Sequence, residues 1–468
     1  MEIPAVEDEN AGIEFLERLA QSLGPRSVVS PADPAEEPVV VRPATTAEVA
    51  AVVRVCAEAG VAIVARGGDT GLSGGTVAPT GRASVVLSLD RLTEIISVDA
   101  DRWSITAQAG VTIEALHEAA AAVDRTFAPD WGARGTATIG GAIATDAGGN
   151  NVVRYGNFRD HVLGLEVVLA DGRIWDGRRS LRKDSSGYDL KQLFIGAEGT
   201  LGIVTSAVLK LVPATPHSQS ALAAISGLGA LMPLLSLAHD HAPGTLTAFE
   251  LMPEVAIERV CSRYGVAHPI DTRAAYYVLV KVASSAPVTE QLTSFLAAAS
   301  TQGFVTDAVV AATAEQESTL WMIRDELPPT RIYPDHHQLG LKLDTAVPID
   351  HIAEFVERVT DLAADIAPMA HCYGFGHVGD GNIHMMILPT NDDAIAAFAD
   401  AKPELQREID ALVFRLHGTL SAEHGLGLLL RDRVEPQKPP IEWELMRLLK
   451  RTLDPDDLFN PGKTLPPG

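Results

Sequence analysis

The chain has 468 residues, with 37 Lys and Arg against 61 Asp and Glu, and a formal net charge of −24 at pH 7. This length exceeds a typical single domain, so we expect two or three compact units. Nucleic acid and anionic lipid are disfavoured as partners because binding either needs a basic surface. A small anionic substrate is compatible with the composition, because local charge in a cleft can oppose the net charge.

The three cysteines, Cys56, Cys261 and Cys372, are far apart in the sequence and form no disulfide or metal-binding pattern. We therefore expect a reducing compartment, the cytoplasm. The acidic N-terminal residues lack the basic start of a signal peptide. No apolar run reaches the roughly 18 residues that a membrane span needs.

The predicted elements begin with a short amphipathic helix over residues 12–23. A glycine-rich region of short strands and helices extends from about 36 to 213, where Pro213 and Pro216 mark a boundary. Its expected strands are 61–65, 85–89, 95–98 and 104–108, followed by a hairpin of 163–169 and 173–175.

A different alternation extends from about 214 to 418. The expected strands are 220–225, 245–251, 275–282, 305–311, 339–347, 370–377 and 383–388, and the expected helices are 228–240, 288–300, 314–327, 351–366 and 403–417. Asp350 is the expected N-cap of the helix at 351. The pattern predicts an α+β fold with mostly antiparallel pairing, divided into segments 1–35, 36–213, 214–418 and 419–468.

Three segments rich in glycine and small residues lie within the first region: 66–75, 135–150 and 196–205. Glycines let the backbone approach a ligand with its N–H groups exposed, an arrangement that holds phosphate. The first segment alone could be a flexible surface loop, but the other two favour a long, flat cofactor. Neither a Rossmann fingerprint nor a P-loop is present.

These segments, in this order, resemble the FAD-binding domain of the vanillyl-alcohol oxidase and p-cresol methylhydroxylase superfamily. Further matches are Pro129-Asp130, Arg154-Tyr155-Gly156, residues 181–184, residues 187–190 and the tail motif at 460–463. The resemblance implies a two-part FAD-binding domain, an antiparallel-sheet substrate (cap) domain and a short C-terminal helical segment near the flavin.

The resemblance also implies which residues contact FAD. They are Arg66, Gly67, Gly68, Asp69, Thr70, Gly71, Gly74, Gly75, Pro129, Asp130, Thr138, Ile139, Gly140, Gly141, Ala144, Thr145, Glu198, Gly199, Gly202, Ile203, Val204 and Asn460. Some members of the superfamily tether FAD through His or Cys. The first segment here has neither, which implies non-covalent FAD.

A second constellation suits a divalent metal such as Zn²⁺. His377 and His384 flank a Gly-Asp-Gly turn, and Glu423 precedes His424 in another glycine-rich bend. Two imidazoles and a carboxylate form a common ligand set that leaves coordination positions open. Each histidine alone could be an ordinary core or surface residue. We assign His377, His384 and Glu423 as ligands and His424 as the general base.

The same motifs resemble the D-2-hydroxy-acid dehydrogenase branch, which includes D-lactate, glycolate and D-2-hydroxyglutarate dehydrogenases. That resemblance assigns Arg324 to substrate carboxylate binding. Lys342 matches a substrate lysine of the D-2-hydroxyglutarate enzymes, which favours a dicarboxylate. Pro328 and Met386 replace hydrogen-bonding residues of those enzymes, so a longer or more apolar hydroxy acid stays open.

The sequence therefore predicts an FAD-dependent dehydrogenase that oxidises a D-2-hydroxy acid to the 2-oxo acid. The predicted substrate is D-2-hydroxyglutarate or D-malate; alternatives are D-lactate, glycolate or a longer apolar acid. A metal-dependent hydrolase and a flavin-binding protein without catalysis are the competing classes. The electron acceptor, whether electron-transfer flavoprotein, quinone or cytochrome, is not specified by the residues, and a homodimer is expected only from relatives.

Overall fold

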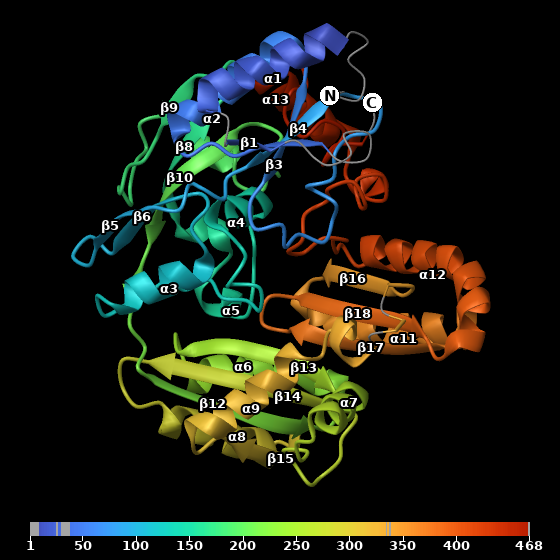
Figure 1. Cartoon of the computed structure of the whole chain (residues 1–468). Helices are drawn as coiled ribbons and strands as arrows, with labels where there is room; N and C mark the ends of the chain where they lie inside the picture. Colours follow the sequence, from blue (N-terminus) through green and yellow to red (C-terminus); the bar gives the residue numbers. More distant parts are fainter. Residues whose placement is uncertain (1–8, 25–26, 30–37, 334, 337, 467–468) are drawn as a thin grey trace. The chain divides into compact units, whose positions relative to one another are not determined.

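A computed structural model describes residues 9–24, 27–29, 38–333, 335–336 and 338–466 (Figure 1). Contacts between residues divide the chain into two compact units. Unit 1 comprises Met1–Gly149, Gly156–Pro213 and Glu423–Gly468, and unit 2 comprises Asn150–Tyr155 and Ala214–Ala422. Both units mix helices with β-sheet, and the expected α+β class is confirmed.

Unit 1 contains a small sheet in the order β1-β2-β4-β3, in which β2, β4 and β3 are parallel. The strands are β1 (Val28–Val29), β2 (Val39–Val41), β3 (Ala62–Arg66) and β4 (Ser84–Ser88), and they share a core with α1 (Glu9–Leu23) and α2 (Thr46–Ala59). The strand β3 leads directly into the first glycine-rich segment.

The helix α2 illustrates how local sequence specifies this part of the fold. The Thr45 hydroxyl caps its N-terminus by accepting from the Glu48 N–H, and Gly60 ends it in the left-handed conformation at φ 67°. The residues Val49, Val52 and Val53 are fully buried on one face. Burying a side chain of this size stabilises the fold by about 1.5–3 kcal/mol.

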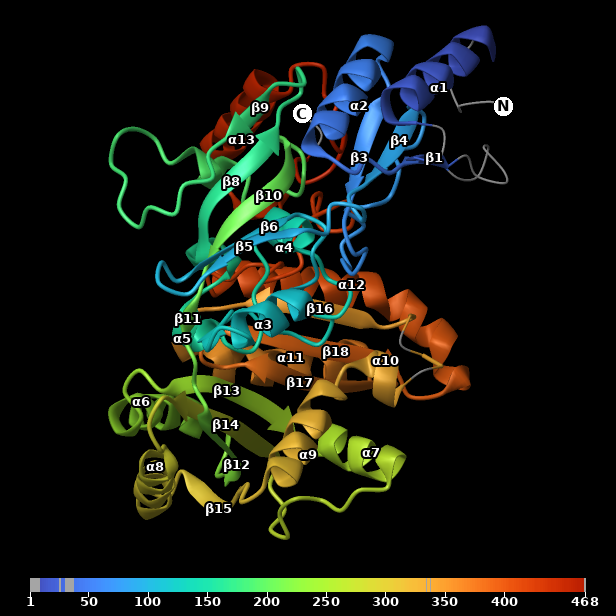
Figure 2. The ribbon, with the colours of Figure 1, turned by 60° about the vertical axis from the view of Figure 1, so that its left-hand side comes forward.

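The second sheet of unit 1 is antiparallel, in the order β5-β6-β10-β8-β9 (Figure 2). Its strands are β5 (Ile95–Asp99), β6 (Ser104–Gln108), β8 (Val162–Val168), β9 (Ile174–Asp176) and β10 (Ile203–Lys210). The expected hairpin is the pair β8–β9. Further elements of this part of the unit are α3 (Ile113–Ala121), β7 (Arg125–Thr126), α4 (Ile139–Thr145), η2 (Phe158–His161), η3 (Leu190–Leu193), β11 (Val212–Pro213) and, near the C-terminus, η7 (Glu435–Gln437) and α13 (Pro440–Leu453).

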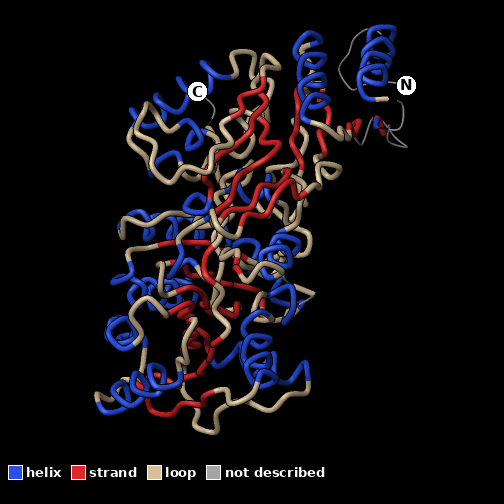
Figure 3. The backbone as a smooth tube through the Cα atoms, turned by 90° about the vertical axis from the view of Figure 1, so that its left-hand side faces the viewer, coloured by secondary structure: helices blue, strands red, loops and turns tan. Residues whose placement is uncertain are grey.

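Unit 2 is built on one antiparallel sheet in the order β15-β12-β14-β13-β17-β18-β16. Its strands are β12 (His217–Ile225), β13 (Leu246–Pro253), β14 (Tyr276–Ser284), β15 (Val305–Val310), β16 (Leu341–Ala346), β17 (Ala370–His377) and β18 (Asn382–Pro389). The tube in Figure 3 distinguishes these strands from the helices of the unit. The helical elements are α5 (Val152–Tyr155), η4 (Leu228–Ala230), α6 (Leu231–His241), α7 (Glu254–Tyr264), α8 (Thr289–Thr301), α9 (Ala314–Asp325), α10 (Pro329–Ile332), η5 (Ile349–His351), α11 (Ile352–Ile366), η6 (Asp392–Ala394) and α12 (Ile395–Arg415).

Two expectations about helix starts in unit 2 are wrong. Asp350 is not the N-cap of α11, because a 3₁₀ turn over Ile349–His351 precedes the helix and places His351 at the cap position. The helix expected at 403–417 begins earlier, at Ile395, and includes Pro403 in its interior. Proline usually marks a helix start or break, which explains the late predicted boundary. The helix α7 lies outside the predicted helices of this unit.

Candidate functional site

Unit 1 contains a cavity of about 360 Å³ whose wall is built mainly from the three glycine-rich segments. The predicted FAD contacts that line it are Arg66, Gly67, Gly68, Asp69, Thr70, Gly71, Gly75, Thr138, Gly140, Gly141, Ala144, Thr145, Glu198, Gly199, Gly202, Ile203, Val204 and Asn460. Segments far apart in the sequence therefore meet around one concave surface, as a long cofactor requires.

Four predicted FAD contacts lie outside the lining of this cavity: Gly74, Pro129, Asp130 and Ile139. Ile139 is fully buried in the core of unit 1, and the Pro129 carbonyl lies 2.8 Å from His117 Nε2. Asp130 pairs with Arg134 at 2.9 Å. Conversely, the lining includes Ser73, Trp131, Gly148, Gly149 and Phe194, which were not assigned. Gly148 and Gly149 lie within the glycine-rich segment 135–150, whereas nothing in the sequence marks Phe194.

The first two glycine-rich segments pack directly against each other. A Cβ atom on Gly68 would lie 1.9 Å from the Thr136 carbonyl oxygen, so only glycine fits there. The hydroxyl of Thr138 is buried and has no hydrogen-bond partner within the described part of the chain. Because Thr138 also lines the cavity, this polar atom fits a ligand that offers hydrogen-bonding groups, as FAD does.

Unit 2 holds His377 within a buried ionic cluster. Glu250 on β13 lies opposite His377 on β17, and its Oε1 is 2.7 Å from Nδ1 of the imidazole. Arg324 on α9 places Nε and Nη2 at 3.0 and 2.9 Å from the other carboxylate oxygen. Burial alone would raise the pKa of Glu250, but His377 and Arg324 hold it at about 2.

This cluster bears on the assignment of His377 as a metal ligand and on that of Arg324 to the substrate carboxylate. With Nδ1 directed at Glu250, Nε2 is the His377 nitrogen suited to a metal. Nη2 of Arg324 lies 3.3 Å from that Nε2, so a bound metal would have to displace this contact. Arg324 is 9% exposed and its Nε edge is engaged by Glu250.

His384 lies on β18, on the same face of the sheet as His377. Its register partners are Asp344 on β16 and Phe375 on β17. Its Nδ1 is 3.6 Å from Asp344 Oδ1, and Asn382 donates to the same carboxylate oxygen at 3.0 Å. His384 is thus surrounded by groups that orient an imidazole.

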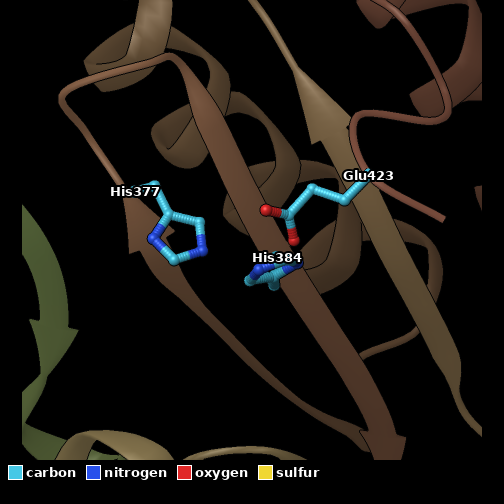
Figure 4. A group of neighbouring side chains, drawn as sticks. All are labelled: His377, His384 and Glu423. Atoms are coloured by element: carbon cyan, nitrogen blue, oxygen red, sulfur yellow. The ribbon is translucent and has the colours of Figure 1, made fainter. Parts of the chain in front are cut away.

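Glu423 and His424 follow the last residues of unit 2 along the chain. The Ala422 N–H donates to the Asp344 carbonyl at 3.1 Å, which ties the approach of this segment to β16. One ligand atom each from His377, His384 and Glu423 lies within 4.8 Å of the others (Figure 4). This donor set fits a divalent cation. Ligand atoms of Asp344, Glu423 and His424 also lie within 4.8 Å of one another, so the position of His424 suits a metal ligand as well as a base.

Lys342 and His424 occupy different surroundings. Lys342 is an exposed residue of the edge strand β16, paired in register with Met386, on the same sheet face as Asp344. Desolvation by neighbouring atoms still lowers its pKa. His424 lines the unit 1 cavity beside Glu423.

Matches to family models cover most of the chain. Residues 38–178 match an FAD binding domain, and residues 215–464 match the C-terminal domain of FAD linked oxidases. The D-2-hydroxyglutarate dehydrogenase of Xanthomonas citri pv. viticola is 37% identical over 405 residues, which cover 86% of this chain and 83% of the relative. The mitochondrial D-2-hydroxyglutarate dehydrogenase of Bos taurus is 35% identical over 404 residues, covering 86% and 72%.

Solved structures with low sequence identity share the fold. p-Cresol methylhydroxylase with substrate bound aligns with a TM-score of 0.72 at 15% identity, covering 99% of this chain and 98% of that one. 4-Ethylphenol oxidase from Gulosibacter chungangensis aligns with a TM-score of 0.71 at 17% identity, covering 99% of both. The resemblance drawn from the motifs is confirmed. No described helix is long and apolar enough to cross a membrane.

Proposed function

Because the chain belongs to the D-2-hydroxyglutarate dehydrogenase family of FAD-dependent oxidoreductases, we propose that it oxidises a D-2-hydroxy acid to the 2-oxo acid. The observation that carries this proposal is the position of His424 and Glu423 on the wall of the glycine-lined cavity. A proton acceptor and a metal ligand there adjoin the space assigned to FAD. Residues 36–213 would form the FAD-binding domain and 214–418 the substrate domain.

Oxidation of a secondary alcohol removes the hydroxyl proton and a hydride from the same carbon. FAD, when bound, supplies the hydride acceptor. His424 would take the hydroxyl proton on a ring nitrogen, since imidazole is the side chain best suited to exchange protons near neutral pH. With substrate and FAD bound, the glycine-lined wall would exclude water from one side of the reacting carbon.

His377, His384 and Glu423 would hold a divalent metal, Zn²⁺ or similar. Such an ion lowers the pKa of a coordinated hydroxyl and fixes the orientation of the α-carboxylate. Glu250 and Asp344 support the two imidazoles through the contacts described above. Removing either support would let the ligand rotate out of position.

The proposed substrate is a dicarboxylate such as D-2-hydroxyglutarate or D-malate. Lys342 supports this choice because it lies on the sheet face of His384 and would pair with a second carboxylate, while Arg324, 3.3 Å from His377 Nε2, would bind the other substrate carboxylate. Met386 favours a second candidate, a longer apolar acid. Its side chain is 6% exposed and belongs to the core cluster that includes Tyr373 and Phe375.

A screen of D- and L-2-hydroxy acids with an artificial dye acceptor tests the proposed activity. It should include 2-hydroxyglutarate, malate, lactate and longer-chain forms, together with the achiral glycolate. Turnover confined to D-isomers supports the proposal, and no turnover with any of them would refute it. A purified protein without a flavin spectrum would instead favour a metal-dependent hydrolase, and flavin that does not bleach anaerobically would favour binding without catalysis.

The compartment, the electron acceptor and the oligomeric state of the enzyme are also proposals. The three cysteines are all unpaired, which suits a reducing compartment such as the cytoplasm, although several relatives are named as mitochondrial. The electron acceptor would be an electron-transfer flavoprotein, a quinone or a cytochrome. A homodimer is tested directly by sedimentation.

A further inference from the structure

The segment from Glu423 to Leu429, here called the catalytic segment, is bonded to each of the three glycine-rich segments. Ser73 of the first, Gly149 of the second and Glu198 of the third all contact it. These residues belong to unit 1 and line the cavity. The cavity wall and the segment carrying His424 therefore form one hydrogen-bonded assembly.

Ser73 contacts the catalytic segment through both its side chain and its backbone. The hydroxyl lies 2.9 Å from the His424 carbonyl and 2.8 Å from the Gly425 carbonyl, to which it donates. The Ser73 carbonyl accepts from the Leu428 N–H at 2.9 Å. Ser73 is 5% exposed, so water does not replace these bonds readily.

Glu198 holds the same segment from another direction. Its two carboxylate oxygens each accept a backbone N–H, from Leu426 and from Gly427, both at 2.8 Å. Glu198 is 8% exposed, and its own backbone is in the left-handed region at φ 51°. A non-glycine residue in that conformation is strained, and such strain persists where the surrounding structure enforces it.

Two glycines of the catalytic segment allow this close approach. A Cβ atom on Gly427 would lie 2.0 Å from the Ser73 carbonyl oxygen, and Gly427 has φ 48°. A Cβ atom on Gly425 would lie 2.8 Å from the carboxyl carbon of Glu198. Their small size thus serves contact with Ser73 and Glu198, independently of any cofactor.

We propose that Ser73 and Glu198 are positioning residues that hold the backbone of the catalytic segment and thereby aim the His424 imidazole at the substrate. This inference rests on the proposed function, in which His424 takes the substrate proton. Ser73 fixes the carbonyl of His424 itself, and Glu198 fixes the two residues that follow Gly425. The loop assigned to the cofactor phosphates would then also set the alignment of the base.

Backbone amide hydrogen exchange tests the clamp without any substrate. In the FAD-loaded full-length protein and in the apoprotein, Ser73→Ala should speed exchange of the amides of Leu426, Gly427 and Leu428. Glu198→Gln should do the same, because an amide NH₂ replaces one acceptor opposite a backbone N–H. Ser206→Ala is the matched control: Ser206 is also a buried serine of unit 1 that donates to a carbonyl, Ala107, but it is far along the chain from the segment.

Stopped-flow flavin reduction tests the consequence for catalysis. We expect Ser73→Ala to slow reduction by about 10²-fold, the size of effect that a displacement of about 1 Å produces, with the substrate KM changed much less. Glu198→Asp, which keeps two oxygens, should recover part of the rate that Glu198→Gln loses. FAD affinity, measured by flavin fluorescence, should change less than the reduction rate.

The outcomes separate this inference from the proposed function. If exchange and reduction in Ser73→Ala and Glu198→Gln both match Ser206→Ala, neither residue positions the segment. If exchange rises but FAD affinity falls as much as the rate, the residues only hold the cofactor, and the inference is also overturned. If no D-2-hydroxy acid reduces the wild-type flavin, the proposed function fails, while the exchange result still decides whether the clamp exists.

Discussion

Glu250 and His377 lie opposite each other on β13 and β17 and are joined through Oε1 and Nδ1 at 2.7 Å, with side chains only 1% and 6% exposed. A carboxylate at Nδ1 selects the tautomer that leaves Nε2 as the accepting nitrogen. Arg324 neutralises the second carboxylate oxygen. His377, the metal ligand assigned from the sequence, is thus held in a buried ionic cluster. Its other members, Glu250 and Arg324, come from elements distant in the sequence.

Replacing Glu250 with Gln should destabilise the protein strongly. The variant removes the buried carboxylate that pairs with Arg324 at 2.9 Å and leaves only the half-exposed Asp325 at 3.8 Å among the described ion pairs, and breaking a buried ion pair costs about 3–5 kcal/mol. Urea unfolding of the FAD-loaded protein measures the change. Glu354→Gln serves as the control, because Glu354 contacts His351 at 3.2 Å with a side chain that is 54% exposed. The control substitution should lower the free energy of unfolding by about 0–1 kcal/mol. Equal losses of unfolding free energy in both variants would contradict this account.

Chelation should abolish turnover while FAD stays bound. His377, His384 and Glu423 are the proposed ligands, and of these only Glu423 also lines the cavity, whose wall is formed mainly by the glycine-rich segments. His384→Ala should have the same effect, and His351→Ala, at a partly exposed histidine elsewhere in unit 2, should not. Turnover and the flavin absorption spectrum are measured after dialysis against a chelator. Full activity in protein shown by elemental analysis to be metal-free would end the metal assignment.

FAD should be released entirely when the protein is denatured with acid. The described cavity lining includes His424 as its single histidine and no cysteine, and His424 is assigned to proton transfer. Neither Asp69 nor Thr70 in the first loop forms a stable link to flavin. The measurement is the visible absorption of supernatant and pellet after precipitation. Yellow colour retained with the precipitated chain would show a covalent link.

Lys463 should make stability rise with pH above about 8. Burial lowers its pKa from 10.5 to about 8, against an opposing contribution from Glu198. Between these two values the unfolded chain binds the proton and the folded chain does not, so unfolding becomes less favourable as pH increases. Below pH 8 both states are protonated and this contribution is constant. Urea unfolding from pH 7 to 10 should show a steeper rise in the free energy of unfolding for the wild type than for Lys463→Met. Identical dependence on pH in the two proteins would refute the lowered pKa of Lys463.

Lys342→Met should selectively impair a dicarboxylate substrate. Lys342 is exposed, so solvent screens its charge, and we expect kcat/KM for a D-2-hydroxy dicarboxylate to fall by about 1–2 kcal/mol, a factor of roughly 5–30. A D-2-hydroxy monocarboxylate should be affected much less. Steady-state kinetics on both substrates decides the matter. Equal losses on the two substrates would assign Lys342 to the α-carboxylate or to the fold.

The local sequence was sufficient for the elements that carry the site. The alternation and glycine content predicted the α+β class, the β8–β9 hairpin and most strands of unit 2. The motifs around 66–75, 135–150 and 196–205 identified most of the cavity wall, because close backbone approach to a cofactor requires small residues that are visible in the sequence. The N-cap of α11 and the start of α12 were predicted wrongly, because a 3₁₀ turn and an interior proline overrode the usual cap signals.

Tertiary structure alone decided which side chains support the site. Glu250 lies 127 residues before its partner His377, and Ser73 lies 351 residues before the carbonyl of His424. Glutamate and serine are common surface residues, and nothing in their neighbours marks them as buried. Their roles arise from strand register in unit 2 and from loop packing in unit 1. Burial then strengthens their charges and hydrogen bonds, and that property belongs to the folded chain and not to any local pattern.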